Sequence, residues 1–486
     1  MAYNLARNSR VFATTNVNAA GVVQASGFTT ANTWEIQVLD GFKFSQATNT
    51  TNIQINEAGD TPIRGQRAFN TALNPVDITF STYIRPRIAS NQATAEERIL
   101  WNALMGSVAV GDAGTALGGT GHGMARTDTA SPNVTFTGTA MATTLTVGKI
   151  YNVTGLTGSG APKVYNTPVK IVSNVAATTV VEYLTNPPVG ALANVTASAT
   201  TTFTEAAWVE YPTASGITTS YGQVTTAKSG RNQLQALGFI FVVDGSTYTI
   251  DNCCLDQAQL DFGLDAIAMV NWTAKGTKLN QLATAVALSN VQDPVLSGGL
   301  TGTATGKVTT ANYITNKLST VNITAKFNTS DITMDGTAYS VVLTGGNITI
   351  ANNINYVTPN NIGTLNIPIG YYTGARSISG SMNAYLRTGS VGGNPQTATL
   401  LKDLLTASAK ATDTKFALGF QIGGSTAATR VELDMPGAMI GIPSVDIADV
   451  VSTTITFNAQ GTNTANTTGQ FDIENTNDLT VRYYSA

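Results

Sequence analysis

Few residues in this chain have the side chains and spacing that catalysis requires. The single histidine, His122, lies in the glycine-rich stretch GGTGHG, and no Gly-x-Ser-x-Gly nucleophile pattern occurs. A serine-hydrolase triad would have to use this histidine, so we interpret it as an exposed loop residue. Glu96 and Glu97 could form an acid–base pair, but two carboxylates at the start of a predicted helix are better explained by the positive end of its dipole.

The two cysteines, Cys253 and Cys254, are adjacent, which excludes a disulfide framework and favours a reducing compartment. Asp251 and Asp256 lie nearby, but a metal site would need more thiolate or imidazole ligands. Because consecutive strand residues point to opposite faces, we expect one thiol in the core and the other against a partner. The alternative is a redox role for the pair.

The segment GLTGSGAPK (155–163) lacks the full phosphate-loop spacing, so we interpret it as a turn. We therefore expect no catalytic residue, no metal and no cofactor, and we predict that the protein is not an enzyme. A glycan-degrading β protein with two hidden carboxylates is the enzymatic alternative.

The composition points to surfaces that meet protein rather than bulk water. Only 11% of the 486 residues are charged, against a usual ~25%, and the net charge is −3. This charge gives no reason to expect a grip on nucleic acid. The start, MAYNLARNSRVF, lacks the apolar region of a signal peptide. The longest apolar runs, such as LGFIFVV (237–243), are too short to cross a membrane.

Two similar helical segments, TAEERILWNALMG (94–106) and TATLLKDLLTASA (397–409), lie about 300 residues apart. In the first, Thr94 and Glu97 have the spacing of a capping box, which predicts that the helix begins at Thr94. The apolar residues of both segments fall on one helical stripe. The expected anchors of the two helices are Ile99, Leu100 and Leu104 in the first, and Leu400, Leu401, Leu404 and Leu405 in the second.

The similarity extends on both sides of the helices. Tyr83-Ile84-Arg85 corresponds to Tyr385-Leu386-Arg387, LGFIFVVDGST to LGFQIGGST, and WTAKGT to FNAQGT. Leu100 and Leu401 are 301 residues apart, whereas Leu237 and Leu418 are 181 apart. The difference, 301 − 181 = 120, is the length of an insertion in the first repeat, and it is large enough for a small domain.

We therefore predict two tandem modules. Module one covers residues 1–110 plus 230–290, module two covers 307–486, and 291–306 is a linker rich in Gly and Thr. Residues 111–229 form a small all-β inserted domain, because short strands there alternate with Gly, Pro and Asn.

Alternating apolar and polar residues predict strands through most of the two modules. Examples are 33–45, 76–84, 247–263, 266–276, 452–461 and 478–485. The predicted class is mainly β (α+β), in which each module is a β-sandwich or partial barrel with one flanking helix.

The most charged stretch is NEAGDTPIRGQR (56–67), with Glu57, Asp60, Arg64 and Arg67. Its glycines and proline predict a loop. It is either a solvated hairpin tip or a loop that docks on a neighbouring subunit, with its charges setting the register.

Several segments together resemble the tail tube proteins of long-tailed bacteriophages. They are LARNSRVF, EIQVLDGFKFSQ, NEAGDTPIRGQRAFNTAL, the Tyr-Ile-Arg-Pro strand end, DNCCLDQAQLDFGLDAIAMVNW and FDIENTNDLTVRYY. The resemblance covers module one and, more faintly, module two. It implies subunits whose sheets join edge to edge into rings, and rings that stack into a hollow tube. Such a tube holds a tape-measure protein and later conducts double-stranded DNA into the host.

Many such rings contain six single-domain subunits, whereas this chain carries two modules. We therefore expect a homotrimeric ring with pseudo-six-fold symmetry, assembled in the host cytoplasm and located in the virion tail. The resemblance also implies partners: the tape-measure protein, transiting DNA without specific binding, baseplate or tail-tip and terminator proteins, and a tail sheath where the tail has one. No membrane partner is expected.

The expected lumen wall is polar with a slight acidic bias, so that phosphates do not adhere. The candidates are Asp77, Thr79 and Ser81 in one strand, and Gln257, Gln259 and Asp261 in another. The inserted domain is expected to project outward as a decoration. The alternative function is another phage structural role, such as a capsid decoration protein, or an adhesin built from β modules.

Overall fold

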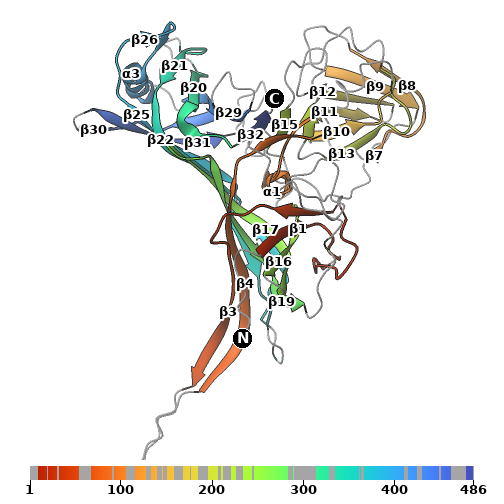
Figure 1. The fold of residues 1–486 in the computed structure, drawn as a ribbon. Helices are drawn as coiled ribbons and strands as arrows, with labels where there is room; N and C mark the ends of the chain where they lie inside the picture. Colours follow the sequence, from red (N-terminus) through yellow and green to blue (C-terminus); the bar gives the residue numbers. More distant parts are fainter. Residues whose placement is uncertain are drawn as a thin grey trace, which may run out of the picture.

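The computed structural model consists almost entirely of antiparallel β-sheet, which confirms the mainly-β prediction (Figure 1). It describes residues 9–484 except 19, 30–31, 54–66, 90–91, 106–114, 127–132, 140–144, 146–149, 158–167, 176, 184–194, 206–208, 212–220, 226–233, 244–245, 283–287, 289–312, 328–333, 361, 363–365, 410–413, 424–428, 448–449 and 461–477. The described strands form one sheet of 19 strands, one of 7 strands and three short hairpins. Two α-helices lie within the described ranges.

Module one folds as two layers that share one long strand, β17 (Ser246–Gly263). The first half of β17 pairs with β16 (Leu237–Val243) and β19 (Lys278–Leu282). The second half pairs with β18 (Met269–Gly276), and β18 pairs with β4 (Arg67–Tyr83).

The remaining strands of module one extend both layers. β1 (Ser9–Thr14) joins β16 to β2 (Thr33–Ile36), and β3 (Lys43–Ile53) pairs with β4. The single strand predicted over 33–45 is therefore wrong. A turn at Asp40 and Gly41 splits it, and Gly41 has a φ of +94°, which residues with a side chain rarely adopt.

Module two repeats this arrangement. β22 (Leu343–Ala351), β25 (Ser377–Tyr385) and β31 (Ser452–Gln460) pair in that order. β29 (Arg430–Ile440) and β30 (Ser444–Asp446) follow on the far side of β31. The other layer contains β20 (Thr320–Ala325), β21 (Ala338–Val341) and β28 (Lys415–Ile422), and a 3₁₀ turn (Asn316–Leu318) precedes β20.

Each module carries one helix, α1 (Arg98–Met105) and α3 (Thr397–Ser408). The predicted start of α1 at Thr94 is wrong, because Thr94 lies in β6 (Gln92–Ala95), which pairs with β5 (Pro86–Ala89). The carbonyl oxygen of Glu97 accepts the first helical hydrogen bonds instead. A short hairpin of β26 (Ser390–Val391) and β27 (Asn394–Pro395) precedes α3.

The helix anchors differ between the modules. Ile99, Leu100 and Leu104 of α1 are buried in the main core, as are Leu400 and Leu404 of α3. Leu401 is half-buried, and 52% of Leu405 is exposed. The single stripe of four leucines expected for α3 is therefore narrower than predicted.

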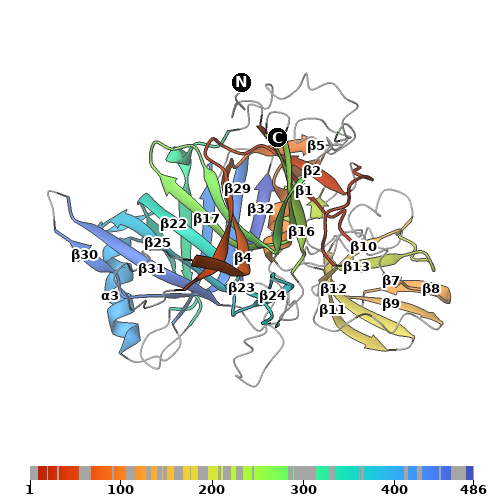
Figure 2. The same ribbon diagram turned by 90° about the horizontal axis from the view of Figure 1, so that it is seen from below.

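The seven-stranded sheet lies within the predicted insertion and has its own core (Figure 2). Phe136 and Phe203 form an edge-to-face pair there, with ring centroids 5.5 Å apart. Its strands, in spatial order, are β7 (Thr115–Ala116), β13 (Thr202–Glu205), β10 (Ile150–Thr154), β11 (Pro168–Val175), β12 (Thr178–Tyr183), β9 (Asn133–Thr139) and β8 (Thr120–Ala125).

The last strand, β32 (Thr480–Tyr484), joins the insertion to module two. It pairs with β29 on one side and with β15 (Tyr221–Thr225) on the other, and β14 (Val209–Tyr211) pairs with β15. Thus β14 and β15, although within 111–229, belong to the main sheet.

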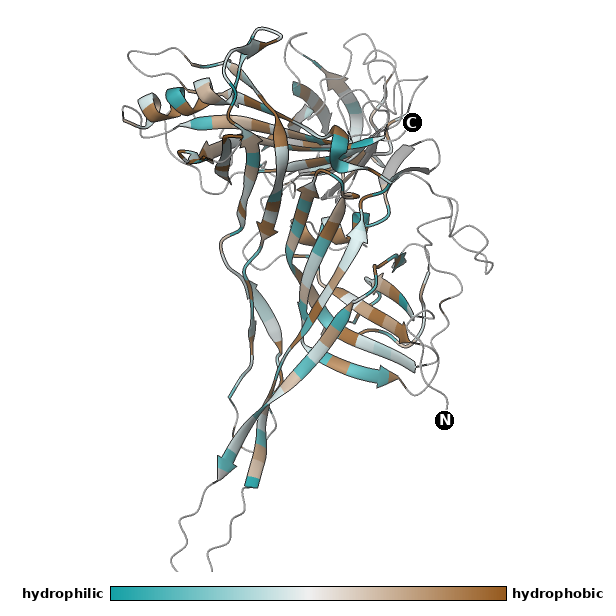
Figure 3. Cartoon of the chain, turned by 60° about the vertical axis from the view of Figure 1, so that its left-hand side comes forward, coloured by the Kyte–Doolittle hydropathy of each residue, from teal (hydrophilic) through white to brown (hydrophobic). Residues whose placement is uncertain are grey.

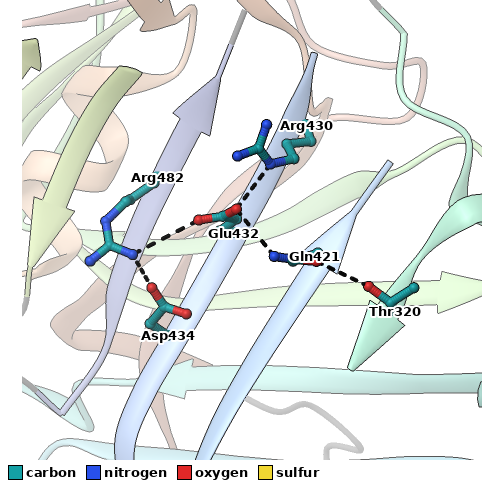
Figure 4. Close-up of polar contacts among 6 residues, drawn as sticks. All are labelled: Thr320, Gln421, Arg430, Glu432, Asp434 and Arg482. Atoms are coloured by element: carbon teal, nitrogen blue, oxygen red, sulfur yellow. Dashed lines mark hydrogen bonds and ion pairs between the residues drawn. The ribbon is translucent and has the colours of Figure 1, made fainter. Parts of the chain in front are cut away.

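A chain of polar side chains runs across β32, β29, β28 and β20 (Figure 4). Arg482 donates to Asp434 and forms an ion pair with Glu432. Arg430 and Gln421 also donate to Glu432, at 2.9 and 3.3 Å. Gln421 then accepts a hydrogen bond from Thr320, and these contacts hold the C-terminal strand in register.

Candidate functional site

The main feature of the molecule is a sheet that continues from module one into module two. β17 of module one pairs with β22 of module two, from Gln257 opposite Ala351 to Gly263 opposite Gly345. The strand order across this junction is β3, β4, β18, β17, β22, β25 and β31. Residues paired between adjacent strands point to the same face, so side chains of both modules share one continuous surface.

This surface, which we call the polar face, carries rows of small polar side chains. One row contains Ser81, Asn271, Gln259, Thr349, Ser379 and Asn458, each opposite the next. The row on one side contains Met269, Asp261, Asn347, Ser381 and Thr456. The row on the other side contains Thr79, Thr273, Gln257, Ala351 and Ser377. All are exposed or half-buried.

The six lumen candidates therefore come together on one face. Asp77, Thr79 and Ser81 lie in β4, Gln257, Gln259 and Asp261 lie in β17, and β18 separates the two sets. The sequence alternation placed each set on a polar face, but only the pairing through β18 shows that the faces are the same. That this face lines a pore stays a prediction.

Hydrogen bonds tie the polar face together. Asp261 accepts from the amides of Gln259 and Asn271, at 2.8 and 3.0 Å. The Ser81 hydroxyl donates to Asn271 at 2.6 Å. Such bonds saturate the polar groups and leave fewer of them free to bind a passing molecule.

The reverse side of the same strands is the main apolar core. Ile78, Phe80, Trp272, Ile350 and Phe457 alternate with the polar residues and are all buried. α1 covers this side in module one, where Trp101 packs edge-to-face on Trp272 with ring centroids 5.0 Å apart. Burial of large aromatic rings on one side fixes which residues face outward on the other.

Most of the described charges on the polar face belong to module one. Paired positions place Lys43, Asp77, Lys275 and Asp261 there, two acids and two bases. The slight acidic bias expected for a lumen wall stays a prediction. In module two, the positions that correspond to Lys43, Asp77 and Lys275 carry Thr349, Ser377 and Gln460, and β30 adds Asp446 opposite Ser452.

The junction between the modules is locked by specific contacts below the polar face. The Asn352 amide donates to the carbonyl oxygens of Leu104 and Leu255, at 2.8 and 3.1 Å. The Asp256 carboxylate accepts the backbone N–H of Ile354 at 2.7 Å and forms an ion pair with Lys275 at 3.3 Å. Because Asn352 is buried, these bonds are needed to offset its desolvation.

Each module also extends a hairpin from the same end of the sheet, and the two differ in their support. The hairpin of module two, β23 (Ile354–Val357) and β24 (Gly370–Thr373), packs on module one. The Tyr356 hydroxyl lies 2.7 and 2.6 Å from the carbonyl oxygens of Asn252 and Lys275, which share its one proton, and the Tyr371 hydroxyl donates to the carbonyl oxygen of Leu234.

The β3–β4 hairpin of module one, which we call the arm, extends away from the rest of the chain (Figures 1 and 3). Residues 49–52 and 67–71 are exposed on both faces, and Phe69 is 51% exposed. Arg67 lies in this exposed part, whereas Glu57, Asp60 and Arg64 fall outside the described residues. A two-stranded hairpin with both faces in water is marginally stable by itself, which points to a partner.

The residues with possible chemistry are not assembled into a site. His122 lies half-buried in β8, where its Nε2 atom is 2.5 Å from the carbonyl oxygen of Gly118. Within the described ranges, no group of three or more His, Cys, Asp or Glu residues could hold a metal ion. In the same part of the chain, no helix is long and apolar enough to cross a membrane.

Both cysteines are fully buried, so the prediction that one thiol faces another chain is wrong for the described structure. Cys254 packs on Ile354 of module two, which makes module two its partner. Burial raises the pKa of Cys254 to about 12, and the hydroxyls of Tyr371 and Tyr356 oppose this only in part. A thiol held in its protonated form is a poor nucleophile.

Glu97 is a buried carboxyl that the capping-box pattern misassigned. It accepts a hydrogen bond from the Tyr483 hydroxyl, which accepts one from the Trp101 indole at 3.0 Å. Burial raises the pKa of Glu97 to about 7 despite the Tyr483 hydrogen bond. The network connects α1 to the C-terminal strand, 386 residues away in sequence, and no local pattern could have revealed it.

No known family profile matches the chain. A curated protein, tail tube protein pb6 of Escherichia phage T5, is 26% identical to it over 464 residues. The match covers 94% of this chain and 73% of the phage T5 protein. This match confirms the resemblance drawn from the sequence: the chain is similar to a phage tail tube protein.

Proposed function

We propose that this chain is a structural subunit of a phage tail tube, located in the virion tail. The match to a tail tube protein supports the role, and the observation that carries it is the continuous polar face. A sheet with a dry apolar side and a wet, nearly neutral side is suited to a wall. The same properties argue against an enzyme, because the face holds no nucleophile–base pair among its described residues.

We propose further that the sheet closes into a ring. Each chain supplies two modules, so three chains would supply six, and a homotrimer would have pseudo-six-fold symmetry. Unpaired sheet edges promote association, and closure removes them. Because the two edges of this sheet differ, the contact is head-to-tail and gives a ring when the rotation closes.

In this proposal the polar face lines the lumen, which first houses a tape-measure protein and then conducts double-stranded DNA during ejection. Binding of DNA is driven by Lys and Arg that neutralise phosphates and release counterions. The described charges on this face, two acids and two bases in module one and Asp446 in module two, supply no such net attraction. DNA would therefore slide rather than adhere.

Stacking of rings would use the two ends of the strands. The turn after β17 and the 3₁₀ turn expose Leu264, Ile267, Tyr313 and Leu318 at one end. The module-two hairpin and its connection expose Val357, Ile362, Ile367, Ile369 and Tyr372 at the other. Apolar ends of this kind would be covered in a stacked tube. The arm, with Arg67 at the start of β4, would add contacts that fix the register, and Glu57, Asp60 and Arg64, which lie outside the described residues, stay candidates for the same contacts.

The seven-stranded sheet would project from the tube as a decoration. Its separate core supports independent folding. Since β14 and β15 pair with the main sheet, the dispensable part is bounded by Thr115 and Glu205. Replacing this stretch with a short Gly-Ser linker should leave tube assembly intact. The remaining partners we propose are the tail-tip or baseplate and terminator proteins and, in a contractile tail, a sheath.

Negative-stain microscopy of the purified chain tests the proposal. We expect rings or hollow rods with a central pore, because the exposed edges favour association. Solid fibres, or monomers at every concentration tested, would contradict it. Assembly of the chain in the cytoplasm of an expressing cell would appear as the same rods in fresh lysate.

A further inference from the structure

The junction inside the chain is a template for the junction between chains. Within the chain, the free edge of β22 meets the free edge of β17, and Thr349 lies opposite Gln259. In module one, β3 has the place of β22, because each pairs with the strand that precedes the helix. In module two, β29 and β30 have the place of the second half of β17, since both pair with the WTAKGT or FNAQGT strand.

These counterparts are the two outer edges of the sheet. In the described chain, β3 pairs with β4 alone. The segment from Gly441 to Asp446 pairs with β31 alone, whereas β28 covers β29 as far as Met439. Each module thus presents one edge of the kind that is joined inside the chain.

The unpaired edge of module two, residues 441–446, exposes two apolar side chains beside Pro443 and Asp446. Ile442 is 55% exposed and Val445 is 42% exposed, and Met439, which pairs with Lys415 just before this edge, is 41% exposed. Natural proteins blunt edges that stay in water with charges, prolines or covering loops. Pro443 and Asp446 supply part of this protection, but Ile442 and Val445 remain exposed beside them, and a covering strand would remove their apolar surface from water.

We propose that β3 of one chain pairs with the 441–446 edge of a second copy of this chain, in the register that the internal junction sets. The inference rests on the proposed tube role, which it extends by naming the two edges. In module one, Thr79 lies opposite both Lys43 and Thr273, and in module two, Ser379 lies opposite both Thr349 and Asn458. With Thr273 and Asn458 of the WTAKGT and FNAQGT strands as the anchor, Lys43 corresponds to Thr349, which is two residues from the position that Tyr83 and Tyr385 as the anchor would give.

The other strand of the seam follows in the same way. Thr273 lies opposite Gln257 and Asn458 lies opposite Met439, so Met439 corresponds to Gln257. Gly441 lies two residues after Met439, so it corresponds to Gln259, which lies two residues after Gln257. Lys43 of one chain is thus expected opposite Gly441 of the next, with Met439 on the diagonal of the same face.

Paired cysteines test the seam. In the double variant Lys43→Cys/Met439→Cys, a short bismaleimide should link neighbouring chains of an assembled ring into covalent trimers. The thiols of Cys253 and Cys254 are fully buried, so the bismaleimide should react only with the introduced cysteines. Gln257→Cys/Thr349→Cys has the same diagonal geometry inside one chain and is the positive control. Thr79→Cys/Met439→Cys places one thiol a strand further away and should link on the order of tenfold less.

The outcomes separate the seam from the tube role. Rings that form without Lys43→Cys/Met439→Cys cross-links, while the positive control reacts, would overturn the seam and leave the tube role standing. Wild-type chain that never assembles would contradict both. Equal cross-linking of the Thr79→Cys/Met439→Cys control would also overturn the proposed register.

A second pair of variants covers the case in which the cysteines disturb assembly. Ile442→Asp places a charge in the seam and should leave the folded chain as monomers. Val172→Asp, at a position 40% exposed in the inserted sheet, is the matched control and should assemble like the wild type. Normal rings from Ile442→Asp would contradict the proposal.

Discussion

The two modules repeat one plan but differ in how much of each is supported within the chain. The hairpin of module two rests on module one through Asn352, Tyr356 and Tyr371, whereas the arm of module one extends into water. Among the described residues, the polar face carries two acids and two bases in module one, whereas module two carries Asp446 at its edge. In the proposed ring, one of two equivalent contacts lies inside the chain and the other is left to a neighbouring chain.

The largest expected difference between the modules lies under the helices. Trp101 is fully buried against Trp272 and donates to Tyr483, so Trp101→Ala should lower the free energy of unfolding by about 3–5 kcal/mol. Leu405→Ala, at an exposed position of α3, should change it by less than about 0.5 kcal/mol. Urea unfolding followed by circular dichroism measures both, and equal losses would contradict the described packing.

The internal junction should be the next most sensitive region. Asn352→Ala removes an amide that donates to two buried carbonyl oxygens, which should cost about 1–3 kcal/mol. Asn355→Ala is the matched control, because its amide donates once, at an exposed site. Hydrogen exchange should speed up at β22 and the end of β17 in the first variant only. Unchanged exchange there would show that Asn352 does not lock the modules.

The pH dependence of stability should distinguish the two modules, because the residue before the helix is Glu97 in module one and Gln396 in module two. The folded pKa of Glu97, about 7, exceeds its ordinary value of 4.5, so the folded state holds the proton more tightly. Stability should therefore fall as the pH rises from about 4.5 to 7, by roughly 1–3 kcal/mol. Glu97→Gln should flatten this part of the profile, as measured by denaturant midpoints from pH 4 to 8. An unchanged slope would assign the effect to another group.

The smallest expected effect concerns the module-two half of the polar face. Ser379→Lys, in the middle row, should give assembled tubes a weak affinity for double-stranded DNA that disappears as salt increases. Val175→Lys, exposed on the inserted sheet, is the control for charge outside the lumen. Fluorescence anisotropy with short duplexes compares them. Equal binding by both variants would mean that the polar face is not the surface that DNA meets.

Local patterns in the sequence predicted the elements well where a single face is buried. The alternation in 76–84 and the repeated helices with Leu100, Leu104, Leu400 and Leu404 agree with the structure. The pattern failed where a distant contact decides the conformation. The capping-box pattern assigns Glu97 to a helix cap, but its carboxylate accepts a hydrogen bond from Tyr483. The alternation predicts one strand over 33–45, but a turn at Gly41 divides it.

The arrangement of the candidate site depended on pairings that the sequence does not encode locally. The alternation predicts that each set of lumen candidates lies on a polar face. That both sets lie on the same face, which continues into β22, follows from the pairing of strands far apart in the chain. The internal junction at Asn352 and Asp256 carried no recognisable motif. The role of these two residues follows from the fold, which places Asn352 beside Leu104 and Asp256 beside Ile354.

The central claim is that two modules per chain continue one sheet around a pore. An end-on class average of the assembled particle, combined with the mass of one ring from native mass spectrometry, measures this directly. We expect six similar lobes around a central hole and a mass of three chains, each of 50.5 kDa. Six chains in one ring, or a particle without a hole, would contradict the account.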